Sequence, residues 1–161
     1  QNPHQADGHR IAPVEHEEPG HDEGHLTHVE ARQEVGPQAQ QILQAAAILG
    51  PSKWLAVEQK ITLETNPAKA RALGRKELSR YMALPNYRNS WLRQGFTEDE
   101  LADGGSDRFI DAMVLWGDAD AVRRGLRAHF TAGATHVCLQ PVHADGDFAA
   151  RDRMLAALAD S

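Results

Sequence analysis

The chain has 161 residues, enough for one domain, and 41% of them are hydrophobic. Their distribution is uneven, because all nine aromatic residues lie beyond residue 53. Residues 1–47 hold two arginines, no lysine and eight acidic residues, which accounts for the whole net charge of −6. Residues 48–161 hold fifteen charges of each sign. Neither part has the basic surface of a nucleic-acid-binding protein.

The cysteine content and the hydropathy of the sequence indicate the cellular compartment in which the protein is expected. The single cysteine, Cys138, excludes an internal disulfide and agrees with a reducing cytoplasm. No apolar run approaches the roughly 20 residues needed to cross a bilayer, and no signal peptide is evident. We therefore expect a cytoplasmic protein with no membrane partner. The chain begins with Gln1 and not with methionine, so we expect it to be a piece of a longer protein.

Residues 1–47 are predicted to form a largely disordered segment of uncertain origin. They are rich in Gln, Gly, Pro, Glu and His, and they have too few large apolar side chains to offset the entropy of ordering. A genuine tail, a fusion and a shifted reading frame all fit this composition. Translation of the coding DNA upstream of Ile48 in every frame would separate these origins.

Histidines concentrate in this first segment, notably in "HEEPGHDEGHLTH". Imidazoles and carboxylates bind zinc, copper or nickel. However, Pro19, Gly20 and Gly24 disfavour a helix there, and Asp22 breaks the H-E-x-x-H pattern of zinc proteases. We predict no preformed metal site and at most weak chelation. The six histidines are His4, His9, His16, His21, His25 and His28.

The first regular elements are expected after residue 53. The stretch 54–64, "WLAVEQKITLE", is predicted to contain a strand of about six residues. Asn66 and Pro67 then favour a helix start, since Asn caps orphan N–H groups and Pro at the first helical position sacrifices none. An apolar face recurs at helical spacing up to Leu84, and Pro85 is expected to end this helix.

Four further helices and one strand are expected after it. Thr97 and Glu100 form a capping box, with Phe96 and Leu101 as the hydrophobic staple. Ser106 and Asp118 are expected to cap the next two helices, of which the first extends to Gly117 and the second ends at Gly133. The run "THVCLQPV" is predicted as a strand buried on both faces, and residues 148–159 as a last helix. Alternating strands and helices indicate an α/β protein with parallel strands.

Two long stretches resemble a known family. They are "AVEQKITLETNPAKARALGRKELSRYMALPNYRNSWLRQGFTEDEL" and "GGSDRFIDAMVLWGDADAVRRGLRAHFTAGATHVCLQ". From about Ile48 to Val142 the chain is similar to the carboxyl-terminal part of the luciferase-like monooxygenase family. Its closest resemblance is to the branch of oxidoreductases that depend on coenzyme F420, a deazaflavin. The resemblance implies a TIM (β/α)₈ barrel and hydride transfer between the deazaflavin and an organic small-molecule substrate. An FMN-dependent monooxygenase of the same fold is the alternative.

The implied barrel does not fit into this chain. Such a barrel needs about 250 residues and eight strands, whereas residues 48–161 supply two strands, the seventh and eighth in the family pattern. We therefore predict the last two β/α units of a barrel, and expect this chain alone to lack catalytic residues and activity. Its open sheet edges favour self-association. A non-catalytic binding or oligomerising fragment with a His-rich tail is the alternative from another class of function.

Barrel enzymes place their chemistry at the carboxyl ends of the strands. On that basis Glu64, Gln140 and His143 are candidate cofactor-binding residues, and Arg88 is a candidate for the phosphate or acidic tail of the cofactor. Their ordinary interpretation is that of solvated loop or capping residues. The remaining residues considered are expected to be structural: His129 on the surface, Cys138 in the core, and Trp54, Trp91 and Trp116 as packing groups.

Overall fold

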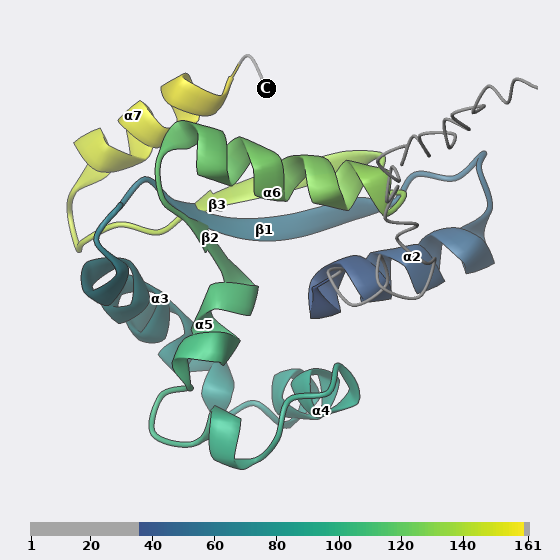
Figure 1. Ribbon diagram of the computed structural model, residues 1–161, viewed down its shortest axis with the longest axis horizontal. Helices are drawn as coiled ribbons and strands as arrows, with labels where there is room; N and C mark the ends of the chain where they lie inside the picture. The colour runs from purple at the N-terminus through teal and green to yellow at the C-terminus, as the bar shows by residue number, and fades with distance from the viewer. Residues whose placement is uncertain (1–35, 160–161) are drawn as a thin grey trace, which may run out of the picture.

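A computed structural model describes residues 36–159, in which helices and strands alternate (Figure 1). The elements are α2 (Pro37–Leu49), β1 (Ala56–Thr62), α3 (Pro67–Met82), α4 (Pro85–Arg93), the 3-10 turn η1 (Asp99–Leu101), α5 (Asp107–Met113), β2 (Val114–Trp116), α6 (Ala119–Thr131), β3 (His136–Pro141) and α7 (Phe148–Leu158).

The three strands form one parallel sheet in the order β2-β1-β3. β1 pairs with β3 along six positions, beginning with Ala56 opposite His136. β1 pairs with β2 only over residues 60–62. The predicted α/β class is confirmed, and the two predicted strands are neighbours. The short strand β2 was not predicted.

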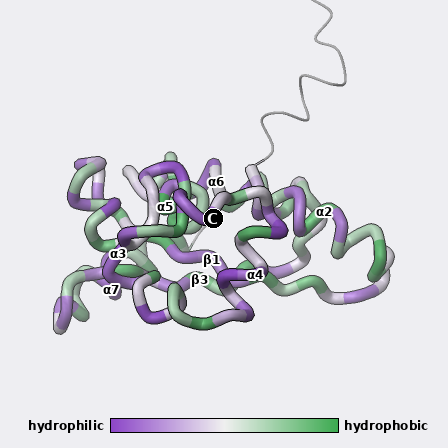
Figure 2. The backbone as a smooth tube through the Cα atoms, turned by 90° about the horizontal axis from the view of Figure 1, so that it is seen from below, coloured by the Kyte–Doolittle hydropathy of each residue, from purple (hydrophilic) through white to green (hydrophobic). Residues whose placement is uncertain are grey.

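One face of the sheet is covered by α6 and α7 (Figure 1). Ile61 of β1 is fully buried there against Val122 and Leu126 of α6 and Met154 and Leu158 of α7. Burial of such a side chain stabilises the fold by about 1.5–3 kcal/mol. In Figure 2 hydrophobic and hydrophilic stretches alternate along the helices, as helices with one buried side require.

The helices α3, α4 and α5 lie on the other side of the sheet and enclose a second apolar cluster (Figure 1). Phe109 of α5 is fully buried in it, and its ring lies edge-on to Trp91, at 4.9 Å between ring centroids, and to Phe96, at 5.2 Å. Edge-to-face pairs at these distances are favourable beyond the area that they bury. This aromatic group joins α4 and α5 to the segment between them.

Helix α2 corrects the prediction of disorder up to residue 47, because it crosses that boundary. Its Ala39 and Ile42 are buried against Ala134, which follows α6. Helix α2 consists mostly of Ala and Gln, and only two of its residues are buried. Its hydrophobic periodicity is therefore too weak to be detected in the sequence. Residues 1–35 of the predicted disordered segment lie outside the described residues.

Side-chain caps begin three helices at the predicted residues. Asn66, Ser106 and Asp118 each accept a hydrogen bond from the backbone N–H three residues further on, at 3.1, 3.1 and 2.7 Å. Loss of such a cap costs about 1 kcal/mol. These local patterns therefore predicted the starts of α3, α5 and α6 correctly.

The capping box is present but does not start the predicted helix. Thr97 Oγ1 accepts from the Glu100 N–H at 3.2 Å, and Glu100 Oε2 accepts from the Thr97 N–H at 3.0 Å. Phe96 and Leu101, the staple residues, are both buried. Only the single turn η1 comes after the box, because residues 103–105 all have positive φ and turn the chain away.

Of two other predicted helix ends, one agrees with the structure and one does not. Helix α3 ends at Met82, before Pro85 as expected, and Pro85 is also the first residue of the unpredicted helix α4, where proline costs no hydrogen bond. The helix expected to extend to Gly117 ends at Met113, and Val114 begins β2. Val114 is β-branched and buried beside β1, so tertiary packing favours the strand.

Strand β3 is covered on one face only, which corrects the prediction of a strand buried on both. Val137 and Leu139 pack toward α6 and α7, whereas His136 and Cys138 on the opposite face are exposed. The helices α3, α4 and α5 pack against β2 and the end of β1 and leave this part of β3 uncovered. The prediction that Cys138 lies in the core is therefore wrong.

Gly74 lets α3 approach α5 closely. A Cβ atom at this position would lie 2.7 Å from Cγ2 of Ile110 and 3.3 Å from Cγ2 of Val114, and both neighbours are buried. We expect Gly74→Ala to lower the free energy of unfolding by about 1–3 kcal/mol, although the same change at an exposed helix position raises it by about 1 kcal/mol. Urea unfolding followed by circular dichroism measures the difference. Ser79→Ala, at an exposed site of α3, should stay within about 0.5 kcal/mol, and a Gly74→Ala variant of raised stability would contradict the close contact.

Candidate functional site

An open groove lies at the carboxyl ends of β1 and β3, between α3 and α7. Its volume is about 490 Å³, and it is lined by Glu64 after β1 and His143 after β3. Asp147 and Arg153 of the α7 region add one charge of each sign to its wall. Two of the predicted cofactor-binding residues therefore share one groove, at the sheet edge where parallel α/β proteins bind ligands.

The polar groups of the groove are held by their own backbone. Glu64 Oε1 accepts a hydrogen bond from the Asn66 N–H at 2.8 Å. His143 Nδ1 lies 2.8 Å from the Ala144 carbonyl oxygen. Because a carbonyl only accepts, Nδ1 carries a proton, and in the neutral ring Nε2 is the acceptor. These hydrogen bonds orient both side chains, and the Phe148 ring, edge-on to His143 at 5.9 Å between ring centroids, adds a contact to the imidazole.

An ion pair lines a neighbouring pocket, which shares Leu73, Val142 and His143 with the groove. Lys76 of α3 donates to Asp145, in the loop before α7, at 2.6 Å. The hydrogen bond from Lys76 and its positive charge hold the pKa of Asp145 below its usual value. Both side chains are exposed, so the pair contributes little to stability.

Gln140 lies on the other face of the sheet, apart from Glu64 and His143. Its Oε1 accepts a hydrogen bond from Lys60 Nζ at 2.5 Å. Side chains alternate between the two faces of a strand, and position 140 faces the same side as Lys60 of β1, its direct partner in the register. Gln140 lies within β3 and not after it, so it does not line the groove of Glu64 and His143.

Lys60 is the centre of a polar cluster that was not predicted from the sequence. Its ammonium group donates to Glu58 Oε1 at 2.7 Å, lies 3.8 Å from Glu77 Oε1, and sits 5.0 Å from the centre of the Tyr81 ring. The Lys60 side chain is nearly fully buried. A lysine inside the predicted strand "EQKIT" was the signal that could have found it, because a buried charge must be paired.

A smaller cavity of about 130 Å³ adjoins Lys60. Its apolar wall comes from Tyr81, Tyr87 and Trp91, with Met113 at one side. The ring centroids of Tyr81 and Tyr87 are 4.7 Å apart, and those of Tyr87 and Trp91 are 5.9 Å apart. This cavity is separate from the groove at the carboxyl ends of the strands.

Arg88, the fourth predicted cofactor-binding residue, belongs to α4. Its guanidinium pairs with Glu98, beyond the end of that helix. It lines neither the groove nor the aromatic cavity. The structure therefore keeps Arg88 apart from Glu64 and His143.

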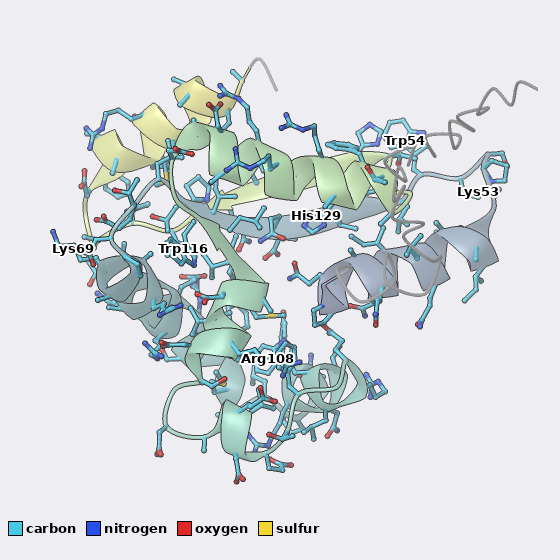
Figure 3. All side chains as sticks on the ribbon, viewed as in Figure 1. Lys53, Trp54, Lys69, Arg108, Trp116 and His129 are labelled. Atoms are coloured by element: carbon cyan, nitrogen blue, oxygen red, sulfur yellow. The ribbon has the colours of Figure 1, made fainter. Side chains whose placement is uncertain are left out.

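A group of ion pairs between α3 and α5 is structural. Arg71 of α3 holds Asp111 of α5 through two hydrogen bonds, at 2.9 and 2.6 Å, and the Trp116 indole donates to the same carboxylate at 2.9 Å (Figure 3). Burial alone would raise the pKa of Asp111, but these hydrogen bonds and the guanidinium charges hold it below its usual value. The group fastens α3 to α5 and β2 and lies outside both cavities.

His129 is buried between α6 and β1, which corrects the prediction of a surface residue (Figure 3). Its Nε2 lies 2.6 Å from Gln59 Oε1. The Gln59 amide nitrogen donates to the carbonyls of Lys60 and Met113, so its oxygen must accept and His129 Nε2 must donate. Nδ1 of the ring is buried and lacks a hydrogen-bond partner. Burial lowers the pKa of His129.

The four residues predicted to bind a cofactor do not form one binding site for a deazaflavin or FMN. Glu64 and His143 share the groove, but Gln140 and Arg88 lie elsewhere. The groove itself has two carboxylates, Glu64 and Asp147, against a single guanidinium, which does not suit the anionic tail of such a cofactor. The described residues thus provide at most one wall of a cofactor site.

No protein-family model, curated protein or solved structure matches the chain in the three comparisons. Among residues 36–159, no cluster of three or more His, Cys, Asp or Glu side chains could hold a metal ion. The six histidines considered as weak chelators lie outside that range. No helix within the described part of the chain is long and apolar enough to span a bilayer.

Proposed function

We propose that this chain is the terminal part of a luciferase-like oxidoreductase of the F420-dependent branch, located in the cytoplasm, and that it does not transfer hydride by itself. The pairing of β1 with β3 supports this lineage. These strands are parallel neighbours joined by helices, as the seventh and eighth strands of a (β/α)₈ barrel would be. Glu64 and His143 meet in one groove at their carboxyl ends, where such a barrel places its chemistry.

The proposed lack of activity rests on the surroundings of that groove. A closed barrel has eight strands, and residues 36–159 contain three, of which β2 pairs with only three residues of β1. The described residues therefore lack the other strands that would complete a cofactor site around this groove. In a completed barrel, Glu64 and His143 would form one wall of the site, and the contacts to the anionic tail of a deazaflavin would have to come from the other strands.

The test uses the purified 161-residue chain, titrated with oxidised F420 and in parallel with FMN. We expect no saturation of the change in cofactor fluorescence below about 1 mM, and no change in cofactor absorbance when candidate hydride donors are added. Turnover, or micromolar binding, would show that the chain is competent alone. The lineage itself is tested separately, because six further β/α units should be encoded upstream of Ile48 in some reading frame.

A non-catalytic, self-associating fragment is the second candidate. It is favoured by the open sheet edges, since β3 pairs only with β1 among the described strands, and β1 has a strand on its other side over three residues only. Sedimentation of the purified chain distinguishes the candidates. A monomer at all concentrations would rule out association through these edges.

A further inference from the structure

The aromatic cavity beside Lys60 has the size and the lining of a small-ligand site. Its volume of about 130 Å³ is close to that of the engineered cavity of about 150 Å³ that binds benzene. Tyr81, Tyr87 and Trp91 offer ring faces and edges to a planar guest. The cavity is thus matched in size to a single six-membered ring.

The polar lining of this cavity consists of Lys60, Glu58 and Gln38. Lys60 Nζ lies 2.7 Å from Glu58 Oε1 and also donates to Gln140 at 2.5 Å, which leaves one of its three N–H groups for a guest. Glu77 adds a second carboxylate at 3.8 Å from the ammonium group. Lys60 is nearly fully buried, whereas the side chain of Glu58 is 52% exposed. The lysine is therefore fixed by its surroundings, whereas the Glu58 side chain is partly in contact with solvent.

We propose that this cavity binds a small neutral phenol, with the ring among the three aromatic side chains and the hydroxyl group at the Lys60–Glu58 pair. A hydroxyl group both accepts and donates. It can accept from the Lys60 ammonium and donate to the Glu58 carboxylate at the same time. This inference is independent of the proposed function, because the cavity lies apart from the groove of Glu64 and His143.

Charge selects the neutral guest over ionised ones. The polar end has two carboxylates, Glu58 and Glu77, against one ammonium, so it repels a carboxylate guest, and an amine guest would have to displace the Lys60 ammonium from those carboxylates. A hydrocarbon guest would fill the ring space but leave the polar end without added hydrogen bonds. A neutral hydroxylated ring contacts both ends of the cavity without adding charge.

The test is a titration of the ¹⁵N-labelled chain with phenol, and with toluene as the guest that lacks the hydroxyl group. We expect saturable shifts of the Trp91 indole N–H signal, with a phenol dissociation constant on the order of 1 mM and weaker binding of toluene. The indole signals of Trp54 and Trp116, which do not line the cavity, serve as internal controls. Absence of saturable shifts at Trp91, or equal binding of the two guests, would overturn the proposal.

Variants test the polar end. Lys60→Met keeps the length of the side chain and removes its charge, so phenol binding should weaken about tenfold while toluene binding stays unchanged. Lys53→Met, at an exposed lysine before β1, is the matched control and should bind phenol like the parent chain. If Lys60→Met does not fold, Glu58→Leu, at a half-exposed site, takes its place in the test. We expect the same loss of the preference for phenol over toluene. Unchanged selectivity in the folded variant would refute the assigned role of the pair.

Discussion

Replacement of Phe109 by alanine is expected to lower the free energy of unfolding by about 3–5 kcal/mol, a large part of the 5–15 kcal/mol typical of a domain. Phe109 is fully buried, and its ring makes edge-on contacts with Trp91 and Phe96. The ring also packs closely over Gly105. These neighbours come from three separate segments, so they cannot all move inward to fill the space that the ring leaves.

Thermal and urea unfolding, followed by circular dichroism, measure this loss. Phe130→Ala is the matched control, because the same side chain on α6 is 49% exposed. We expect it to change the free energy of unfolding by less than about 1 kcal/mol. Equal losses for the two variants would contradict the burial of Phe109 and the packing of α5 against α4.

The hydrogen bond between Gln59 and His129 is expected to give the second large effect. Gln59→Ala removes the acceptor for His129 Nε2 and the donor for the Met113 carbonyl, all within a buried region. Each buried polar group left without a partner costs about 1–3 kcal/mol, so we expect a loss of about 3 kcal/mol. The Gln59→Leu/His129→Leu double variant should recover much of it, since apolar groups of similar shape need no partners. A double variant as unstable as Gln59→Ala would show that packing, and not the hydrogen bond, is responsible.

The same pair sets a pH dependence of stability. Burial lowers the pKa of His129 below the value of about 6.5 that it has in the unfolded chain. As the pH falls, the unfolded state therefore binds this proton first. The stability that neutral His129 contributes is fully present above about pH 6.5 and is lost as the pH falls toward the folded pKa. Urea unfolding between pH 8 and pH 5 should show this slope in the parent chain and a flatter one in His129→Leu.

Local patterns predicted the starts of helices well and their lengths less well. Asn66, Ser106 and Asp118 cap helices as expected, because a cap depends only on the next three residues. The capping box at Thr97 is formed for the same reason. The length of the helix beyond a cap depends on packing and backbone conformation further along, so a single 3-10 turn stands where a helix was expected.

Burial was predicted less well, because it depends on partners distant in sequence. His129 lies near the end of α6, where a surface position is usual, yet β1 brings Gln59 to it from 70 residues away. Cys138 lies in an apolar run, yet no helix of the described part covers its face of β3. Strand β2 is too short for its three residues to be distinguished from the apolar stripe of α5.

Two of the four candidate site residues lie together. The rule that ligands gather at the carboxyl ends of parallel strands selected Glu64 and His143, and both line one groove, while their cofactor role stays a prediction. Gln140 precedes the end of β3, so the alternation of side chains sends it to the face of Lys60. Arg88 was considered as a candidate for the phosphate or acidic tail of the cofactor, but it lies on the unpredicted helix α4 and does not line the groove. The second cavity was not predicted from the sequence. Lys60, a charged residue inside a predicted strand, could have indicated it, because a buried charge needs partners.

The long separation between β1 and β3 has a consequence for folding during synthesis. Ala56 pairs with His136, 80 positions later in the chain. On the ribosome, β1 therefore emerges well before its main partner, while the nearer strand β2 can pair with only three of its residues. Contacts between such distant positions form late and slowly. Until then α3, α4 and α5 can assemble around Phe109 as a local helical unit, and the sheet is completed last.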